Sequence, residues 1–226
     1  MLIKFRVRGA LRFVSHAEML KVFQRACVRA GIKIQHSQGF NPRPRLSLPL
    51  PRPVGIESDD DLLCLRVYKS TGAQEQKSTS DLCTFIKTKL SEQLPEGVEL
   101  LSVEVPEAKS TPQPRCVTYV LAVRPEYVDN RLKATIKYLS ERKHIIVERT
   151  IYAEKLKIEN RKSQIKEVDV RPFLKSVELD DRSIMVECKF TSAGSIRTEE
   201  IMKLLEIDVE KLTAPIKRAN VQWQKV

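Results

Sequence analysis

Two hydrophobic periods alternate along this 226-residue chain, and their order is what most limits the folds open to it. A period of two residues, as at Ile3, Phe5 and Val7, is typical of a half-buried strand. A period of about 3.6 residues is typical of an amphipathic helix. The first half of the chain shows the order strand, helix, strand, strand, helix, strand. Strands are expected at residues 3–7, 33–36, 62–68 and 98–105, and helices at 16–30 and 80–94.

The same order is expected a second time, beyond a proline-containing linker at residues 106–115. Strands are expected there at residues 117–123, 145–152, 184–190 and 216–223, and helices at 126–142 and 195–205. We therefore predict an α+β fold of two tandem ferredoxin-like (βαββαβ) domains with antiparallel sheets. The N-terminal domain would comprise residues 1–105 and the C-terminal domain residues 116–226. This prediction depends on the order of elements alone, because the two halves share no evident sequence identity.

Composition excludes several classes of protein. The longest uninterrupted apolar run is five residues, 119–123, whereas a bilayer span needs roughly 20. The N-terminal letters MLIKFRVRGALRFV mix charged and apolar residues and lack the apolar core of a signal peptide. Five scattered cysteines form no C-x-x-C pair, and seven glycines form neither a Walker nor a Rossmann pattern. We therefore expect a cytoplasmic protein with no metal, no cofactor and no membrane partner.

The positive charge of the chain is concentrated in its first quarter. Residues 1–57 contain eleven Lys and Arg against two acids, which is +9 of the total net charge of +11. Lys21, Arg25 and Arg29 recur every four residues on the first expected helix and so form a basic stripe on one side of it. This asymmetry predicts a face for phosphates or for an acidic partner.

The first strand offers a second basic surface. In a ferredoxin-like domain the helices cover one face of the sheet, so Lys4, Arg6 and Arg8 would project from the open face. RNA-recognition domains bind RNA on that face through stacking aromatic side chains, and matching aromatics are missing here. The open face could instead pack against another sheet or a partner.

The least ordinary stretch is HSQGFNPRPR at residues 36–45. Five prolines within residues 42–53 exclude a helix and a central strand, so an extended loop is expected. Gly39 permits positive φ and close approach of a ligand, and Asn41 before Pro42 is typical of a turn.

Side chains of this loop suit recognition of a nucleotide. Arg43 and Arg45 alternate on an extended chain and could fork onto phosphate or carboxylate groups. Phe40 could stack on a base or anchor the loop in the core, and Gln38 could read a base or a strand end. The alternative interpretation is a rigid, solvated connector.

Candidate catalytic groups are few. Ser15 and Glu18 form the capping-box pattern S-x-x-E, so His16 would lie in the first turn of a helix, where amide donors and the dipole favour anions. An imidazole there could donate or accept a proton near a phosphate, and His36 is a second weak candidate. The alternative is that Ser15 only caps the helix and His16 only fills its first turn.

A further basic segment lies in the second half. Residues 149–175 include Arg161, Lys162 and Arg171, which could contact nucleic acid or a partner. A mixed-charge connector between two strands is the default interpretation of this segment.

Three stretches of the sequence carry a family resemblance, namely RFVSHAEMLKVFQRACVRAGIKIQHSQGFNPRPRLSLPLPRPVGIES, RKSQIKEVDVRP and the ending KRANVQW. In these stretches the chain resembles the bacterial radical-SAM-linked protein family. Ala17-Glu18 replaces the family's Leu-Asp, Lys21 stands where Arg is usual, and Thr198 follows Arg197 where Pro is usual. The resemblance implies a domain fused to, or encoded beside, a radical SAM protein, often near ribonuclease and ribosomal-protein genes. It supplies no catalytic residue. A looser likeness, in domain order only, is to the tandem ferredoxin-like endoribonucleases that process CRISPR RNA.

Three functions follow as hypotheses. The first is a non-enzymatic, RNA-binding accessory protein that presents tRNA or rRNA to a radical SAM partner. Phosphates would be contacted by Arg25, Arg29, Arg43 and Arg45, and a base or strand end by His16, Gln38, Phe40 and Asn41. The second is a protein-interaction adaptor that binds the radical SAM partner directly. The third is a metal-independent endoribonuclease that uses His16 or His36 as general acid or base.

Overall fold

The computed structural model describes residues 1–68, 78–106, 111–152 and 163–224. Within this part of the chain the fold is α+β, as predicted, with four α-helices and mostly antiparallel strand pairing. The residues cluster into two compact units, the first formed by Met1–Val117 with Pro215–Val226 and the second by Thr118–Ala214. The sequence-based boundary lay at residues 106–115 and assigned the final strand to the second domain. In the structure that strand clusters with the first unit. None of the described helices is long and apolar enough to span a membrane.

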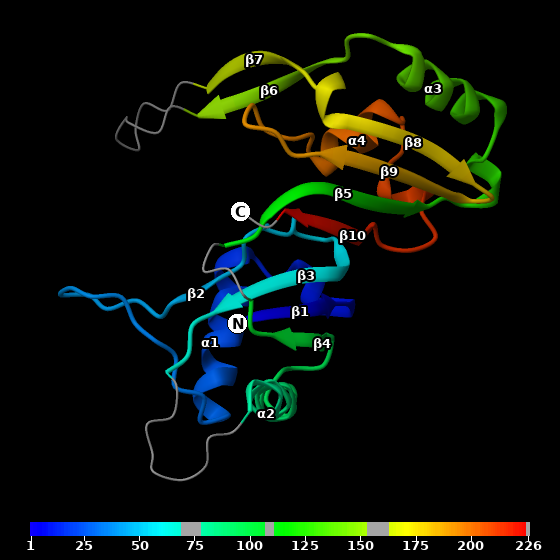
Figure 1. Cartoon of the computed structure of the whole chain (residues 1–226). Coiled ribbons are helices and arrows are strands. Elements are labelled where there is room, and N and C mark those ends of the chain that lie inside the picture. Colours follow the sequence, from blue (N-terminus) through cyan, green and yellow to red (C-terminus); the bar gives the residue numbers. More distant parts are fainter. Residues whose placement is uncertain (69–77, 107–110, 153–162, 225–226) are drawn as a thin grey trace, which may run out of the picture. The chain divides into compact units, whose positions relative to one another are not determined.

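The first strand of unit 1 lies between two other strands of the sheet. β1 (Leu2–Val7) pairs antiparallel with both β3 (Glu57–Leu65) and β4 (Val98–Glu104). The two-residue β2 (Leu46–Ser47) pairs antiparallel with the end of β3, and β10 (Lys217–Gln224) pairs parallel with its beginning (Figure 1). The strand predicted at residues 33–36 consists only of isolated bridges to Val67 and Pro44.

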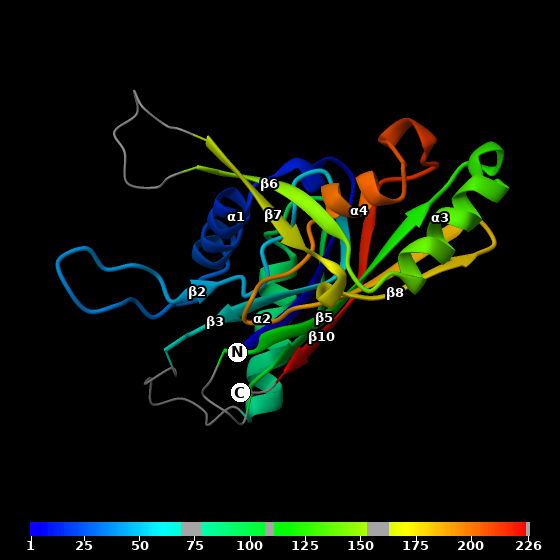
Figure 2. The same ribbon diagram turned by 90° about the horizontal axis from the view of Figure 1, so that it is seen from above.

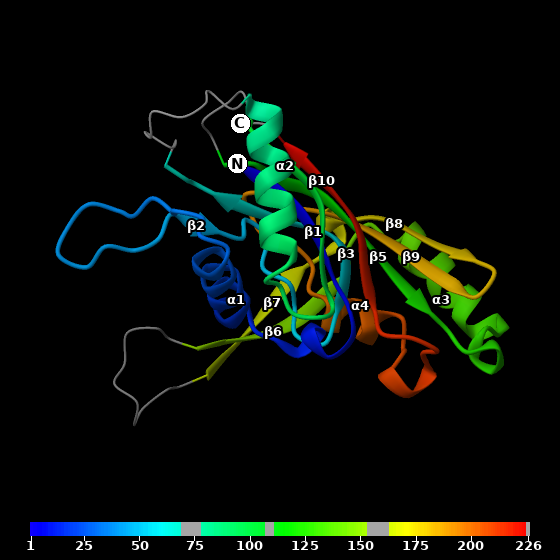
Figure 3. The same cartoon turned by 90° about the horizontal axis from the view of Figure 1, so that it is seen from below.

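Two helices cover one face of these strands, as Figure 3 shows. α1 (His16–Arg29) and α2 (Thr79–Ser91) share one apolar core with β1, β3 and β4. Phe5 of β1 and Phe23 of α1 are fully buried and meet edge to face with 4.7 Å between ring centroids. The predicted alternation in β1 is therefore confirmed, because Ile3, Phe5 and Val7 all point into this core.

A buried ionic cluster joins β10 to β3. Arg218 is 1% exposed, and its Nε and Nη2 donate to Oδ1 of Asp61 at 3.1 and 2.6 Å. Arg52 lies on the other carboxylate oxygen of Asp61 at 3.7 Å and donates to the carbonyl of Ile56. Arg218 also donates to the carbonyl of Pro51 at 3.2 Å. The proline-rich segment is thus held to the sheet by guanidinium groups whose donors find partners inside the protein.

Unit 2 departs from the predicted repeat. Its elements are the second part of β5 (Gln113–Ala122), α3 (Asn130–Glu141), β6 (Ile146–Tyr152), β7 (Ser163–Asp169), β8 (Leu174–Asp180), β9 (Ser183–Lys189) and α4 (Thr198–Leu204). β6 and β7 form a two-stranded sheet of their own, whereas β5, β9 and β8 are neighbours in another. The tandem ferredoxin-like arrangement is therefore not confirmed. The prediction of a simple connector at residues 149–175 was wrong, because this segment contains β7 and the first residues of β8.

Candidate functional site

Residues 35–46 form a narrow loop that we call the basic loop. Its two arms are tied by backbone hydrogen bonds, from Ser37 N to the Arg43 carbonyl at 2.8 Å and from Arg45 N to the Gln35 carbonyl at 2.7 Å. The Ser37 hydroxyl also accepts from the Arg43 amide at 2.9 Å. Figures 1 and 2 both show the loop extending away from β2 and α1. The expected extended loop is confirmed, and its arms are fixed by hydrogen bonds as well as by proline.

The tip of the basic loop carries an aromatic ring in solvent. Phe40 is fully exposed, at 106% of its reference surface, so it does not anchor the loop in the core. Gly39 has φ +120°, a conformation that L side chains rarely adopt. Gln38, Asn41 and Arg43, all within three residues of Phe40, are also exposed. The tip therefore exposes a flat apolar ring together with the amide and guanidinium donors of neighbouring residues.

The basic stripe of α1 is also present. Lys21, Arg25 and Arg29 are exposed and, with Gln24 and Val28, line a shallow concave surface of about 370 Å³. None of the three cations has a carboxylate within 4 Å among the described residues, and the Val28 side chain between them is 71% exposed. The stripe is therefore a positive surface with an apolar centre and no close ion pair, although the Glu18 carboxylate interacts electrostatically with Lys21.

The cations of β1 and of the adjacent Arg8 form ion pairs, unlike the cations of the basic stripe. Lys4 lies 3.3 Å from Asp60, and the Arg8 guanidinium lies 3.1 Å from Asp59. Arg6 lies 3.2 Å from a carboxylate of β4, that of Glu99. Burial alone would raise the pKa of Asp59, but the hydrogen bond from Arg8 and the nearby Lys217 ammonium lower it. The expected basic strand face is therefore largely neutralised by neighbouring strands, and unpaired charge remains on α1 and the basic loop.

The start of α1 is a complete capping box. The Ser15 hydroxyl accepts from the Glu18 amide at 3.3 Å, and the Glu18 carboxylate accepts from the Ser15 amide and hydroxyl at 2.9 and 2.6 Å. These hydrogen bonds lower the pKa of Glu18. Nδ1 of His16 is buried and has no hydrogen-bond partner among the described residues, whereas His36 is exposed. Ser15 therefore acts as the cap, and its hydroxyl is engaged within the helix.

The basic residues predicted in the second half lie in unit 2 or outside the described residues. Arg171 donates to the carbonyls of Arg142 at 2.7 Å and Leu174 at 2.6 Å, so it stabilises the turn between β7 and β8. Arg161 and Lys162 lie outside the described residues. His144 accepts or donates one hydrogen bond, at 2.7 Å, with Asp169. No group of three His, Cys, Asp or Glu that could hold a metal occurs in the described ranges.

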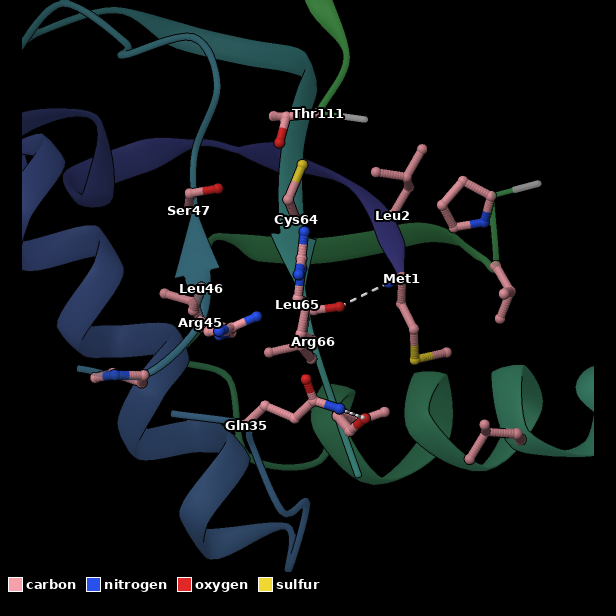
Figure 4. A pocket seen from close by; sticks show the side chains of 15 residues that line it. Met1, Leu2, Gln35, Arg45, Leu46, Ser47, Cys64, Leu65, Arg66 and Thr111 are labelled. Atoms are coloured by element: carbon pink, nitrogen blue, oxygen red, sulfur yellow. Dashed lines mark hydrogen bonds between the residues drawn. The ribbon is translucent and has the colours of Figure 1, made fainter. Parts of the chain in front are cut away.

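A cavity of about 760 Å³ lies at the base of the basic loop (Figure 4). Its polar lining includes Gln35, Arg45, Ser47, Cys64 and Arg66, and its apolar lining includes Leu46 and Val67. The amide of the Gln35 side chain donates to the Val67 carbonyl at 3.0 Å. Burial raises the pKa of the Cys64 thiol. Sequence reasoning named Arg45 but missed Arg66 and Cys64, which it placed in an ordinary strand.

A comparison with known protein families gives a match to this chain. A family model described as "Uncharacterized protein conserved in bacteria (DUF2344)" matches residues 1–204. The chain belongs to this family. The DUF2344 match includes the basic loop, the basic stripe and the cavity, and it ends before β10. A search of curated proteins finds no match.

Proposed function

We propose that this DUF2344 protein is a non-enzymatic, RNA-binding accessory protein that presents its RNA to a radical SAM enzyme. The observation that carries the proposal is the fully exposed ring of Phe40 on a hydrogen-bonded loop flanked by unpaired arginines. Single-stranded nucleic acid is bound in this way, by aromatic rings that stack on bases and by cations that follow the phosphates. The basic stripe would extend the phosphate contacts.

The rigidity of the basic loop supports binding. Backbone hydrogen bonds join its arms, and Pro42 and Pro44 restrict φ near its tip. A loop that is already ordered loses less conformational entropy when it binds. The radical SAM partner and the tRNA or rRNA substrate are implied by the sequence resemblance, and we include them in the proposal on that ground.

The proposal is tested by fluorescence anisotropy with a labelled single-stranded RNA over a series of salt concentrations. We expect log K to fall linearly with log salt, with a slope of about −0.7 for each phosphate contact. The double substitution Arg25→Gln, Arg29→Gln should make the slope less negative by about 1.4. The matched control Lys4→Gln removes a cation already paired with Asp60 and should leave the slope unchanged.

The outcome decides between this function and the adaptor. Absence of any salt-sensitive complex would contradict RNA binding. Co-purification with the radical SAM protein that persists after nuclease treatment and needs Phe40 would instead favour the adaptor. Metal-independent RNA cleavage that is lost in His16→Ala or His36→Ala variants would favour the endoribonuclease.

A further inference from the structure

Two arginines, Arg45 and Arg66, line the same cavity (Figure 4). β2 and β3 pair antiparallel, with Leu46 opposite Leu65 and Ser47 opposite Cys64. Arg45 and Arg66 lie just beyond these paired residues, and the Arg66 amide donates to the Arg45 carbonyl at 3.0 Å. Both side chains line the cavity, and like charges held close together repel each other.

Among the described residues, neither Arg45 nor Arg66 has a carboxylate within 4 Å, unlike Arg6, Arg8, Arg52 and Arg218 of the same unit. Arg25, Arg29 and Arg43 also lack one, but they do not line this cavity. Two exposed guanidinium groups that line one cavity without a counterion suit an anionic ligand, because a bound anion removes their repulsion.

The size and lining of the cavity narrow the class of anion. About 760 Å³ is in the range of sites that hold a single small molecule or one nucleotide. Apolar side chains such as Leu2, Val67 and Leu82 line it together with the two arginines. A ligand with one anionic end and one flat apolar body would satisfy both parts of the lining.

The charge of a phosphate group differs between the end and the interior of an RNA strand. A phosphate monoester carries between one and a half and two negative charges near neutral pH, because its second pKa is about 6. A phosphodiester within a strand carries only one. Two guanidinium groups therefore match the monoester better. We propose that this cavity binds the phosphorylated terminal nucleotide of an RNA strand, with the terminal phosphate between Arg45 and Arg66 and the base on the apolar lining.

This inference rests on the proposed function and names the part of the RNA that is recognised. The basic loop lies at the rim of the same cavity, because Gln35, Pro44 and Arg45 line it. An RNA strand with one base stacked on Phe40 would thus run along the basic loop, and its terminal nucleotide would enter the cavity.

The test compares four oligonucleotides of one sequence, bearing a 5′-phosphate, a 3′-phosphate, both hydroxyl ends, or both phosphates. We expect one of the two phosphorylated ends to raise affinity about tenfold over the hydroxyl strand at pH 7.5, and the preference to shrink below about pH 6. In Arg66→Gln, the affinity for the preferred phosphorylated oligonucleotide should be close to the affinity for the oligonucleotide with two hydroxyl ends. The control Lys4→Gln should leave the preference for the phosphorylated end unchanged.

A second measurement does not depend on RNA affinity. Cys64 lines the cavity, so a nucleoside monophosphate should slow alkylation of Cys64 by a maleimide, as located by mass spectrometry, and should do so less in Arg66→Gln. The unphosphorylated nucleoside is the control and should protect Cys64 less.

The outcomes are distinguishable. Salt-sensitive RNA binding with no preference for any phosphorylated end would overturn the inference and leave the proposed function standing. Protection of Cys64 by nucleoside monophosphates without RNA binding would support the nucleotide cavity and contradict the proposed function. Protection by decanoate but not by a nucleoside monophosphate would show a site for a lipid-like anion and overturn the inference.

Discussion

Arg218 and Asp61 are 157 residues apart in sequence, yet the Arg218 guanidinium donates twice to one carboxylate oxygen of Asp61 in the interior of unit 1. Arg52 approaches the other oxygen, so one carboxylate faces two cations. Backbone carbonyls of Leu11, Arg12 and Ile56 satisfy the remaining donors of Arg52. Burial lowers the pKa of Arg52, and the adjacent Asp61 opposes that shift.

We expect Arg218→Ala to destabilise unit 1 by about 3–5 kcal/mol, because it leaves the buried carboxylate of Asp61 with only Arg52 nearby. Urea unfolding followed by circular dichroism measures this change. The neighbouring substitution Lys217→Ala removes only a partly exposed ion pair with Asp59 and should cost about 1 kcal/mol or less. Equal effects of the two substitutions would contradict the role given to the buried cluster.

We expect Phe40→Ser to separate stability from binding. The side chain is fully exposed, so the free energy of unfolding should change by less than about 0.5 kcal/mol. RNA binding should weaken by about 1–3 kcal/mol, the range found for loss of one stacked base. Phe13→Ser is the matched control, since Phe13 is 58% exposed and stacks under the Arg12 guanidinium at 4.2 Å. Equal losses of RNA affinity in both variants would remove Phe40 from the site.

We expect Arg66→Gln to stabilise the ligand-free protein by about 0.2–1 kcal/mol, because it relieves repulsion from Arg45 in the lining of the same cavity. Thermal unfolding without and with a nucleoside monophosphate measures the effect. The wild type should gain more stability from the ligand than the variant does. A variant less stable than wild type in the absence of ligand would show that the arginine pair is not a source of strain.

We expect the ion pairs around Asp59 to depend on pH in a defined direction. The pKa of Asp59 is lowered in the folded protein, so its contribution is fully present above the unfolded value near 3.8 and is lost as the pH falls through the lower folded value. Asp59→Asn should therefore be less stable than wild type at pH 7, by about 1 kcal/mol, and equally stable near pH 2. Melting curves of both proteins between pH 2 and 7 test this. A constant difference over that range would contradict it.

We expect the cysteines to differ in reactivity. Burial raises the pKa of Cys27 to about 11, so little thiolate forms at pH 8 and no reaction with a disulfide reagent is expected in the folded protein. Cys64 and Cys83 are only partly buried and should react first. Peptide mapping after brief labelling identifies the modified sites, and early labelling of Cys27 would show that the α1 face of the core opens readily.

The parts of the fold that could be predicted are those that bury one face. Phe5 and Phe23 belong to elements with a clear apolar side, and both elements are found close to their expected bounds. β7 was missed because its hairpin is exposed on both sides, with Ile165 70% exposed, so no period of two residues marks it. The loop and stripe could be located from charge and proline spacing.

The remaining site residues could not be found from local sequence. Arg66 becomes significant only when β2 pairs with β3 and brings it into the same cavity lining as Arg45. The neutralisation of Lys4 likewise depends on Asp60 in a strand more than fifty residues away. Pairings of this kind are set by tertiary structure, and no spacing along the chain encodes them.

Because β10 belongs to unit 1, the polypeptide between residues 118 and 214 separates the last strand of that unit from the others along the chain. During synthesis Asp61 is therefore made long before Arg218. Until Arg218 is available, a folded unit 1 would hold the buried carboxylate of Asp61 with only one of its two cations. Unit 1 can reach its final stability only after the ribosome has released the strand that carries its last counterion.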